Sequence, residues 1–85
     1  MNIDVYKSET TLLKFVCVQA GADVSTALFH SGDPDLRLIA AFKRNVKLEP
    51  AHPVVGLNAL EVINQITRQG YSVQQLQIHP KLGDT

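Results

Sequence analysis

The residues best suited to contact a phosphate form a basic stretch in the middle of the chain. Four basic side chains fall between positions 37 and 47: Arg37, Lys43, Arg44 and Lys47. Lysine and arginine neutralise phosphates and release counterions, so this stretch is a candidate anion or RNA patch. The alternative is a solvated charged turn in which Glu49 pairs loosely with its neighbours. Eight basic and eight acidic residues give a formal net charge of zero, which argues against a dedicated nucleic-acid binder.

One cysteine and three histidines could supply a nucleophile, a base or a metal ligand. Cys17 lies between two valines in an apolar run, where a buried and inert thiol is expected. His30, His52 and His79 are separated by 22 and 27 positions, whereas metal sites usually show paired ligands at short spacing. We therefore assign no catalytic residue, no metal ligand and no cofactor, and we expect the chain not to be an enzyme.

Two acidic residues flank a proline in the segment Asp33-Pro34-Asp35. Paired carboxylates can perform acid–base chemistry or bind a hard cation. Acids around a proline are more often turn and helix-cap residues, with the proline in the first turn of the helix. We expect that structural role here.

A proline-containing loop over residues 49–57 is the candidate partner-binding element. Its candidate binding residues are Pro50, His52, Pro53, Val54 and Val55. Small apolar groups on a stiff loop become ordered at low entropic cost when they bind. The alternative is that the valines fold back over the end of the core, and the sequence leaves both possibilities open.

The length of 85 residues is enough for one domain and too short for two. We expect a single domain over residues 1–79 and a flexible tail over residues 80–85. A lone cysteine excludes an intramolecular disulfide, which suits a reducing compartment. The first residues lack the features of a signal peptide, and no apolar run reaches the length of roughly 18 residues that spans a bilayer. We expect a cytoplasmic protein without membrane partners.

The N-terminal third predicts a β-hairpin. Residues 2–7 alternate between apolar and polar side chains, as in a strand. Residues 8–10 are polar and form a plausible connection. Residues 11–19 are rich in β-branched and aromatic side chains, which favour a well-buried second strand.

The middle of the chain is less regular. Residues 22–31 show helical spacing, with Asp23 as the cap and an end before Gly32. Residues 36–42 fit either a helix capped by Asp33 or a central strand that is apolar on both faces. Residues 43–48 are expected to form a charged turn.

The segment 58–69 predicts the longest helix. Asn58 is the expected N-cap, and Glu61 stands where a capping box needs it. Leu60, Ile63, Ile66 and Thr67, widened by Val62, form the expected apolar stripe, and Gln65, Arg68 and Gln69 are left for solvent. Gly70 provides a left-handed stop. Residues 71–78 then predict a strand with a bulge near Gln74, where two glutamines shift the alternation.

Several short motifs occur together in one order along the chain: Tyr6-Lys7-Ser8, then residues 32–39 (GDPDLRLI), then Lys47-Leu48, then Gln69-Gly70-Tyr71. In this order they resemble the YcgL-like family of small bacterial proteins, over roughly residues 6–75. The resemblance implies that residues 36–42 are a strand in a compact sheet with helices packed on it. It carries over no activity and no catalytic residue.

The predicted fold class is therefore α+β. It consists of a small, mainly antiparallel sheet, made of the N-terminal hairpin, a central strand and a C-terminal strand, with one long and one short helix. The function favoured by the sequence is a non-enzymatic protein-interaction module, acting through an exposed sheet edge or the proline loop. Its partner is an unknown protein or a second copy of the chain. The alternative is weak RNA or nucleotide binding through residues 37–47.

Overall fold

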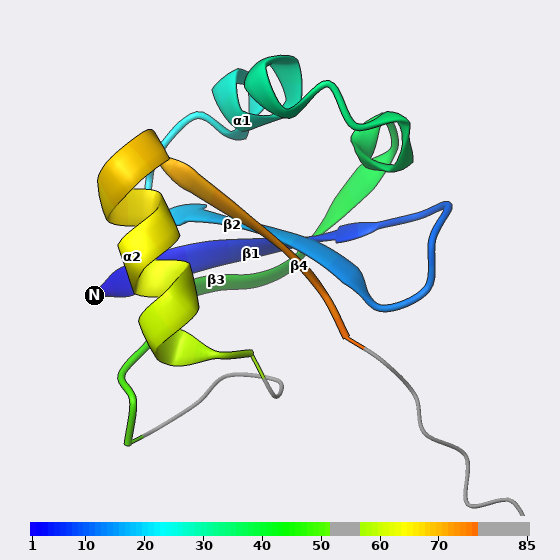
Figure 1. Cartoon of the computed structure of the whole chain (residues 1–85). Coiled ribbons are helices and arrows are strands. Elements are labelled where there is room, and N and C mark those ends of the chain that lie inside the picture. Colours follow the sequence, from blue (N-terminus) through cyan, green and yellow to red (C-terminus); the bar gives the residue numbers. More distant parts are fainter. Residues whose placement is uncertain (52–56, 77–85) are drawn as a thin grey trace, which may run out of the picture.

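A computed structural model describes residues 1–51 and 57–76 of the chain (Figure 1). Its elements are β1 (Asn2–Ser8), β2 (Lys14–Gln19), α1 (Val24–Ser31), the short 3-10 helix η1 (Pro34–Leu36), β3 (Ile39–Lys47), α2 (Ala59–Gln69) and β4 (Tyr71–Gln75). The four strands form one sheet in the order β3-β1-β2-β4, and every pair of neighbours is antiparallel. The predicted α+β class is confirmed.

The hairpin β1–β2 forms the centre of the sheet. Its register runs from Ile3 opposite Gln19 to Lys7 opposite Phe15. β2 begins at Lys14 rather than at the expected Thr11, because Leu13 adopts a left-handed backbone conformation with φ of 59°. The connection between the two strands is therefore longer than residues 8–10.

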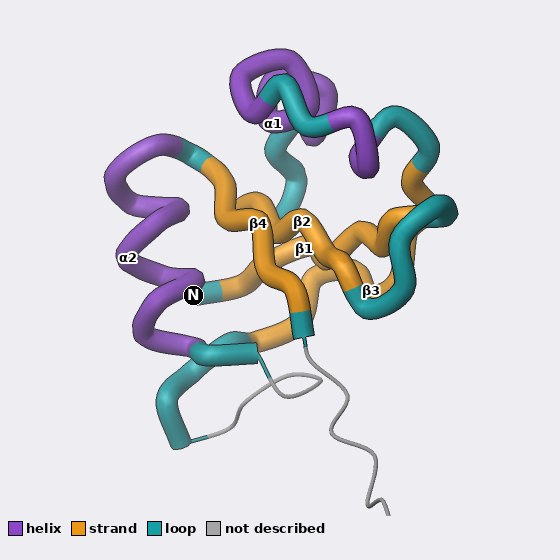
Figure 2. The backbone as a smooth tube through the Cα atoms, turned by 45° about the vertical axis from the view of Figure 1, so that its right-hand side comes forward, coloured by secondary structure: helices purple, strands orange, loops and turns teal. Residues whose placement is uncertain are grey.

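Both faces of the central hairpin are buried, each under a different helix. Side chains alternate between the faces of a strand. One face carries Ile3, Val5, Phe15 and Cys17 into a core with Val62 and Ile66 of α2. The opposite face carries Val16 and Val18 into a second core with Ala27 of α1 and Leu36 of η1. Figure 2 shows the two helices well apart, so the molecule has three layers with the sheet in the middle.

The segment from residue 33 to residue 48 differs from what the sequence predicted. Asp33 caps η1 by accepting a hydrogen bond from the Asp35 N–H at 2.9 Å. The strand begins only at Ile39, and it continues to Lys47 through the residues expected to form a charged turn. It also lies at the edge of the sheet, not at its centre. Mostly exposed side chains along β3 explain why a charged stretch can be extended there.

Both helices begin and end as predicted. Asp23 caps α1, which ends at Gly32 in a left-handed conformation. Asn58 caps α2 by accepting a hydrogen bond from the Glu61 N–H at 3.1 Å. Gly70 ends α2 with φ of 91°, and its N–H donates to the Ile66 carbonyl at 2.8 Å.

The buried face of α2 is rotated from the predicted stripe. Ala59, Val62 and Ile66 are buried, whereas Leu60 is 60% exposed and Thr67 faces solvent. Gln65, which was expected in solvent, is half-buried and accepts a hydrogen bond from the Ser72 hydroxyl at 2.6 Å. Ala59 packs into the same core as Val62 and Ile66, and counting only large apolar residues misses that position.

The last strand contains no bulge over the described residues. The β2–β4 register is continuous from Lys14 opposite Gln75 to Val18 opposite Tyr71. The irregularities of the sheet lie between β1 and β3 instead. Residues 52–56 and 77–85 lie outside the described part of the chain, including His52, Pro53, Val54, Val55, His79 and the expected tail.

We predict that Gly70→Val lowers the free energy of unfolding by about 1–2 kcal/mol, because a β-branched residue is strained at positive φ. A Cβ atom at this position would meet no atom within 4 Å, so backbone strain accounts for the loss. Chemical denaturation measures it. Gly70→Asn is the control and should lose less, since asparagine tolerates this conformation. Equal stability of Gly70→Val and the parent would place the end of α2 elsewhere.

Candidate functional site

Because the helices bury both faces of the central strands, the surfaces left to consider first are the two edges of the sheet. β3 forms one edge and β4 forms the other. An edge strand presents backbone N–H and C=O groups to which another strand can be added. Within the described residues, no strand pairs with the outer side of either one.

The β3 edge is interrupted by two bulges. Ile3 pairs with Val46 and Val5 pairs with Lys43, so two residues of β3 stand opposite the single residue Asp4. Tyr6 then pairs with Ala41, which leaves one further unpaired residue in β3. Each bulge breaks the regular spacing of hydrogen-bonding groups along the strand.

A buried carboxylate fixes the first bulge. Asp4 is 4% exposed, and its two carboxylate oxygens accept hydrogen bonds from the Asn45 N–H at 2.8 Å and the Gly21 N–H at 3.0 Å. Asn45 has φ of 51°, a conformation that asparagine adopts more readily than most residues. The hydrogen bonds from Gly21 and Asn45, with help from the nearby Arg44 charge, lower the pKa of the Asp4 carboxyl.

The neighbouring basic side chains Lys43 and Arg44 lie on opposite faces of the sheet, as consecutive residues of a strand do. The Arg44 guanidinium lies 5.6 Å from the centre of the Tyr6 ring, on the face covered by α1. The Lys43 ammonium lies 5.4 Å from the centre of the Phe42 ring. Phe42 in turn packs against Phe15 with 5.4 Å between ring centres, on the face covered by α2.

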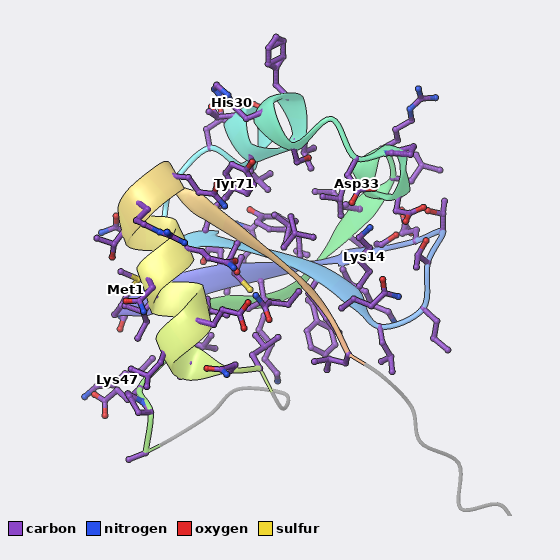
Figure 3. The ribbon with its side chains drawn as sticks, viewed as in Figure 1. Met1, Lys14, His30, Asp33, Lys47 and Tyr71 are labelled. Atoms are coloured by element: carbon purple, nitrogen blue, oxygen red, sulfur yellow. The ribbon has the colours of Figure 1, made fainter. Side chains whose placement is uncertain are left out.

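The other two residues of the predicted basic patch lie at the two ends of the same segment. Arg37 is exposed and follows η1 as its C-terminal cap. The Lys47 ammonium lies 3.2 Å from a Glu49 carboxylate oxygen, near the N-terminus as Figure 3 shows. The structure therefore does not bring the four basic side chains onto one surface. Nucleic-acid binding through them stays a prediction.

The β4 edge is regular, in contrast to β3. The Leu76 N–H donates to the Leu13 carbonyl at 2.9 Å. With the observed register, this bond means that residues 72, 74 and 76 direct their backbone groups toward β2. Tyr71, Val73 and Gln75 therefore direct theirs outward. The Tyr71 carbonyl accepts one hydrogen bond, from the Gln69 side chain at 3.0 Å.

The side chains of β4 are neutral. The strand reads YSVQQ and contains no charged residue, glycine or proline. On the α2 side the Ser72 hydroxyl donates to Gln65, and the Gln74 amide donates to Ser72 at 2.9 Å. On the α1 side Tyr71 and Val73 pack against the second core. Natural proteins usually protect edge strands with charges, prolines or bulges, and β4 has none of these.

The acidic pair around Pro34 has a structural role, as predicted, and also an ionic partner. Lys14 forms ion pairs with both Asp33 and Asp35, and Figure 3 shows Lys14 below the turn that carries Asp33. Hydrogen bonds to Asp33 and then Asp35 raise the pKa of Lys14, and the hydrogen bond from Lys14 lowers the pKa of Asp33. The nearby Ser8 hydroxyl donates to the Asp35 carbonyl oxygen at 2.6 Å. Because its pKa is raised, Lys14 is protonated at neutral pH and cannot act as a base for this serine. The contacts of the cluster anchor η1 to the hairpin.

The remaining candidates for chemistry are not brought together. Cys17 is fully buried, and burial raises its pKa to about 12. His30 is exposed on α1 beside the Phe29 ring. Over residues 1–51 and 57–76, no group of three His, Cys, Asp or Glu side chains could hold a metal ion. No helix within these residues is long and apolar enough to cross a membrane.

Comparison with known proteins adds no family assignment. No protein-family model, curated protein or solved structure matches the chain. The resemblance to the YcgL-like family, and the bacterial origin that it implies, therefore remain proposals.

We predict that Asp4→Asn lowers the free energy of unfolding by about 1–3 kcal/mol at neutral pH, because one of the two N–H donors loses its acceptor. Urea denaturation measures this loss. Asp23→Asn is the matched control: Asp23 is exposed and caps α1, and asparagine caps a helix equally well. An unchanged midpoint for Asp4→Asn would show that the carboxylate does not hold the bulge.

The hydrogen bonds to the Asp4 carboxylate also predict how the free energy of unfolding depends on pH. The pKa of Asp4 is lower in the folded chain than the ordinary value of 3.8, so its contribution is complete above that value. The contribution is lost as the pH falls through the folded-state pKa. The stability difference between the parent and Asp4→Asn should therefore shrink below about pH 4. Denaturation of both proteins between pH 7 and pH 3 tests this, and a constant difference would contradict it.

We also predict that the Cys17 thiol does not react with a disulfide reagent at pH 8 in the folded chain, because the thiolate is the reactive form and burial suppresses it. Unfolding in guanidinium should release one reactive thiol. Thr26→Cys is the positive control, since residue 26 is exposed on α1 and should react immediately. Rapid reaction of Cys17 in the folded parent would reopen the nucleophile interpretation.

Proposed function

We propose that this chain is a non-enzymatic protein-interaction module that binds an extended segment along the outer edge of β4. The observation that carries the proposal is the contrast between the two edges. β3 has two bulges and the basic residues Lys43, Arg44 and Lys47. β4 is regular and uncharged.

Addition of a strand to a sheet edge supplies affinity through the main chain and specificity through alternate side chains. Val73 and Gln75 offer outward N–H and C=O groups to such a strand, and Tyr71 offers its N–H. A partner strand beside them would also extend both layers of the fold. On one face it would meet the half-buried Gln74, which lies beside the buried Ser72, and on the other it would lie next to the partly buried Val73.

The other elements predicted for partner binding have less support. Pro50 is exposed, but the other candidate binding residues of the proline loop, His52, Pro53, Val54 and Val55, lie outside the described part of the chain. The RNA or nucleotide alternative would need the basic side chains on one surface, and Lys43 and Arg44 lie on opposite faces of the sheet. We therefore base the proposed function on β4.

Selection of displayed peptides tests the proposal. A random peptide library is panned against the immobilised parent protein, and the affinity of enriched peptides is then measured for variants. Gln75→Pro removes an outward N–H that β2 does not use, and proline is tolerated at such positions of edge strands. We expect it to weaken binding at least tenfold, which corresponds to about 1.4 kcal/mol.

The matched control is a proline on the opposite edge. The Glu9 N–H donates to the Leu38 carbonyl, so in this part of the β1–β3 register Ala41 directs its N–H outward. Ala41→Pro should leave peptide binding unchanged, and circular dichroism of both variants checks that they fold. The proposal fails if no peptide is enriched, or if Ala41→Pro weakens binding while Gln75→Pro does not.

A further inference from the structure

We infer that the strand received at the β4 edge is β4 of a second copy, so that two sheets join into one continuous antiparallel sheet around a twofold axis at Val73. This inference rests on the proposed function and names its partner. Three observations carry it: the outward backbone groups of β4, the neutrality of its side chains and the protection of the opposite edge.

The backbone of β4 is complementary to itself. Its outward residues are Tyr71, Val73 and Gln75, spaced evenly about Val73. When an antiparallel strand pairs with its own copy about that residue, Val73 faces Val73 of the second copy and Tyr71 faces Gln75. The Val73–Val73 pair is a hydrogen-bonded pair, in which both residues donate and accept. In the two Tyr71–Gln75 pairs the Tyr71 N–H donates to the Gln75 carbonyl, while the Tyr71 carbonyl already accepts a hydrogen bond from the Gln69 side chain. Each copy therefore contributes the same backbone groups to the pairing, as a twofold axis requires.

The side chains on the two faces are also compatible with this pairing. Toward α2, the fully buried Ser72 stands opposite Gln74 of the second copy, so the half-buried Gln74 amide is the group that meets the partner on this face. Within one copy these two side chains already form a hydrogen bond at 2.9 Å. Toward α1, the two Val73 side chains lie next to each other and extend the second core, in which Val73 is partly buried. No like charges oppose each other, and cross-strand pairs of this kind are favourable.

The β3 edge cannot pair with itself in the same way. Residues 39–47 contain three basic side chains and no acidic one, so an antiparallel copy would bring positive charges together along one seam. The two bulges opposite β1 also break the regular spacing of the backbone groups. A second copy therefore fits β4 and not β3.

Analytical ultracentrifugation tests the inference directly. Sedimentation of the parent is measured from low micromolar to near-millimolar concentration, and the average mass should rise toward twice that of a single chain. Gln75→Pro should stay at the mass of one chain over the whole range. Ala41→Pro should follow the parent, because it alters only the β3 edge.

A measurement on the parent alone tests the inference without relying on a variant that could fail to fold. Hydrogen exchange of the backbone amides is followed by NMR at low and high concentration. The outward amides of Tyr71, Val73 and Gln75 should become protected as the concentration rises, whereas the inward amides of residues 72 and 74 are protected throughout. The amides of β3 should not change.

The outcomes of these experiments distinguish an error in the inferred partner from an error in the proposed function. A parent that stays at the mass of one chain overturns the second copy as partner, and the proposed function survives if displayed peptides still bind at β4. A dimer whose protection appears in β3 also overturns the inference. If no dimer forms and no peptide binds, both the inference and the proposed function fail.

Discussion

The buried Asp4 carboxylate is the interaction on which the shape of this molecule depends. A charge in the central strand of a sheet is costly unless its lone pairs are satisfied. Here the N–H groups of Gly21 and Asn45 satisfy them, and one side chain thereby joins the end of the hairpin to the first bulge of β3. That bulge consists of Arg44 and Asn45, which stand opposite Asp4 between the paired residues Lys43 and Val46. The irregular hydrogen-bond spacing of the β3 edge follows from it.

The small size of the chain limits where binding can occur. A domain of this length has little surface to spare, because a short chain must bury a large share of its apolar side chains to be stable. The hairpin β1–β2 is covered by α2 on one face and by α1 and η1 on the other. Within the described residues, the backbone groups at the two edges of the sheet remain open, so another strand can be added there.

Local signals in the sequence predicted the local structure well. The alternation of the hairpin, the caps Asp23 and Asn58, and the stop at Gly70 depend on neighbouring residues, and the structure confirms them. β3 was mistaken in part for a turn because its stability comes from pairing with β1, about forty positions away in the chain. The β4 edge could not be recognised for a similar reason. Strand order is set by long-range pairing, and YSVQQ carries no motif that marks an edge.

The unequal rims of the sheet have a consequence for how far assembly can proceed. A sheet with two receptive rims could add copies at both and grow into a fibril, as cross-β structures do. Here the bulged and cationic rim formed by β3 is unsuited to receive another strand. Once the β4 rims of two copies have met, no receptive rim remains among the described strands. The proposed dimer would therefore not extend into a longer sheet, because the bulge at Asn45 makes the β3 edge unsuited to receive another strand.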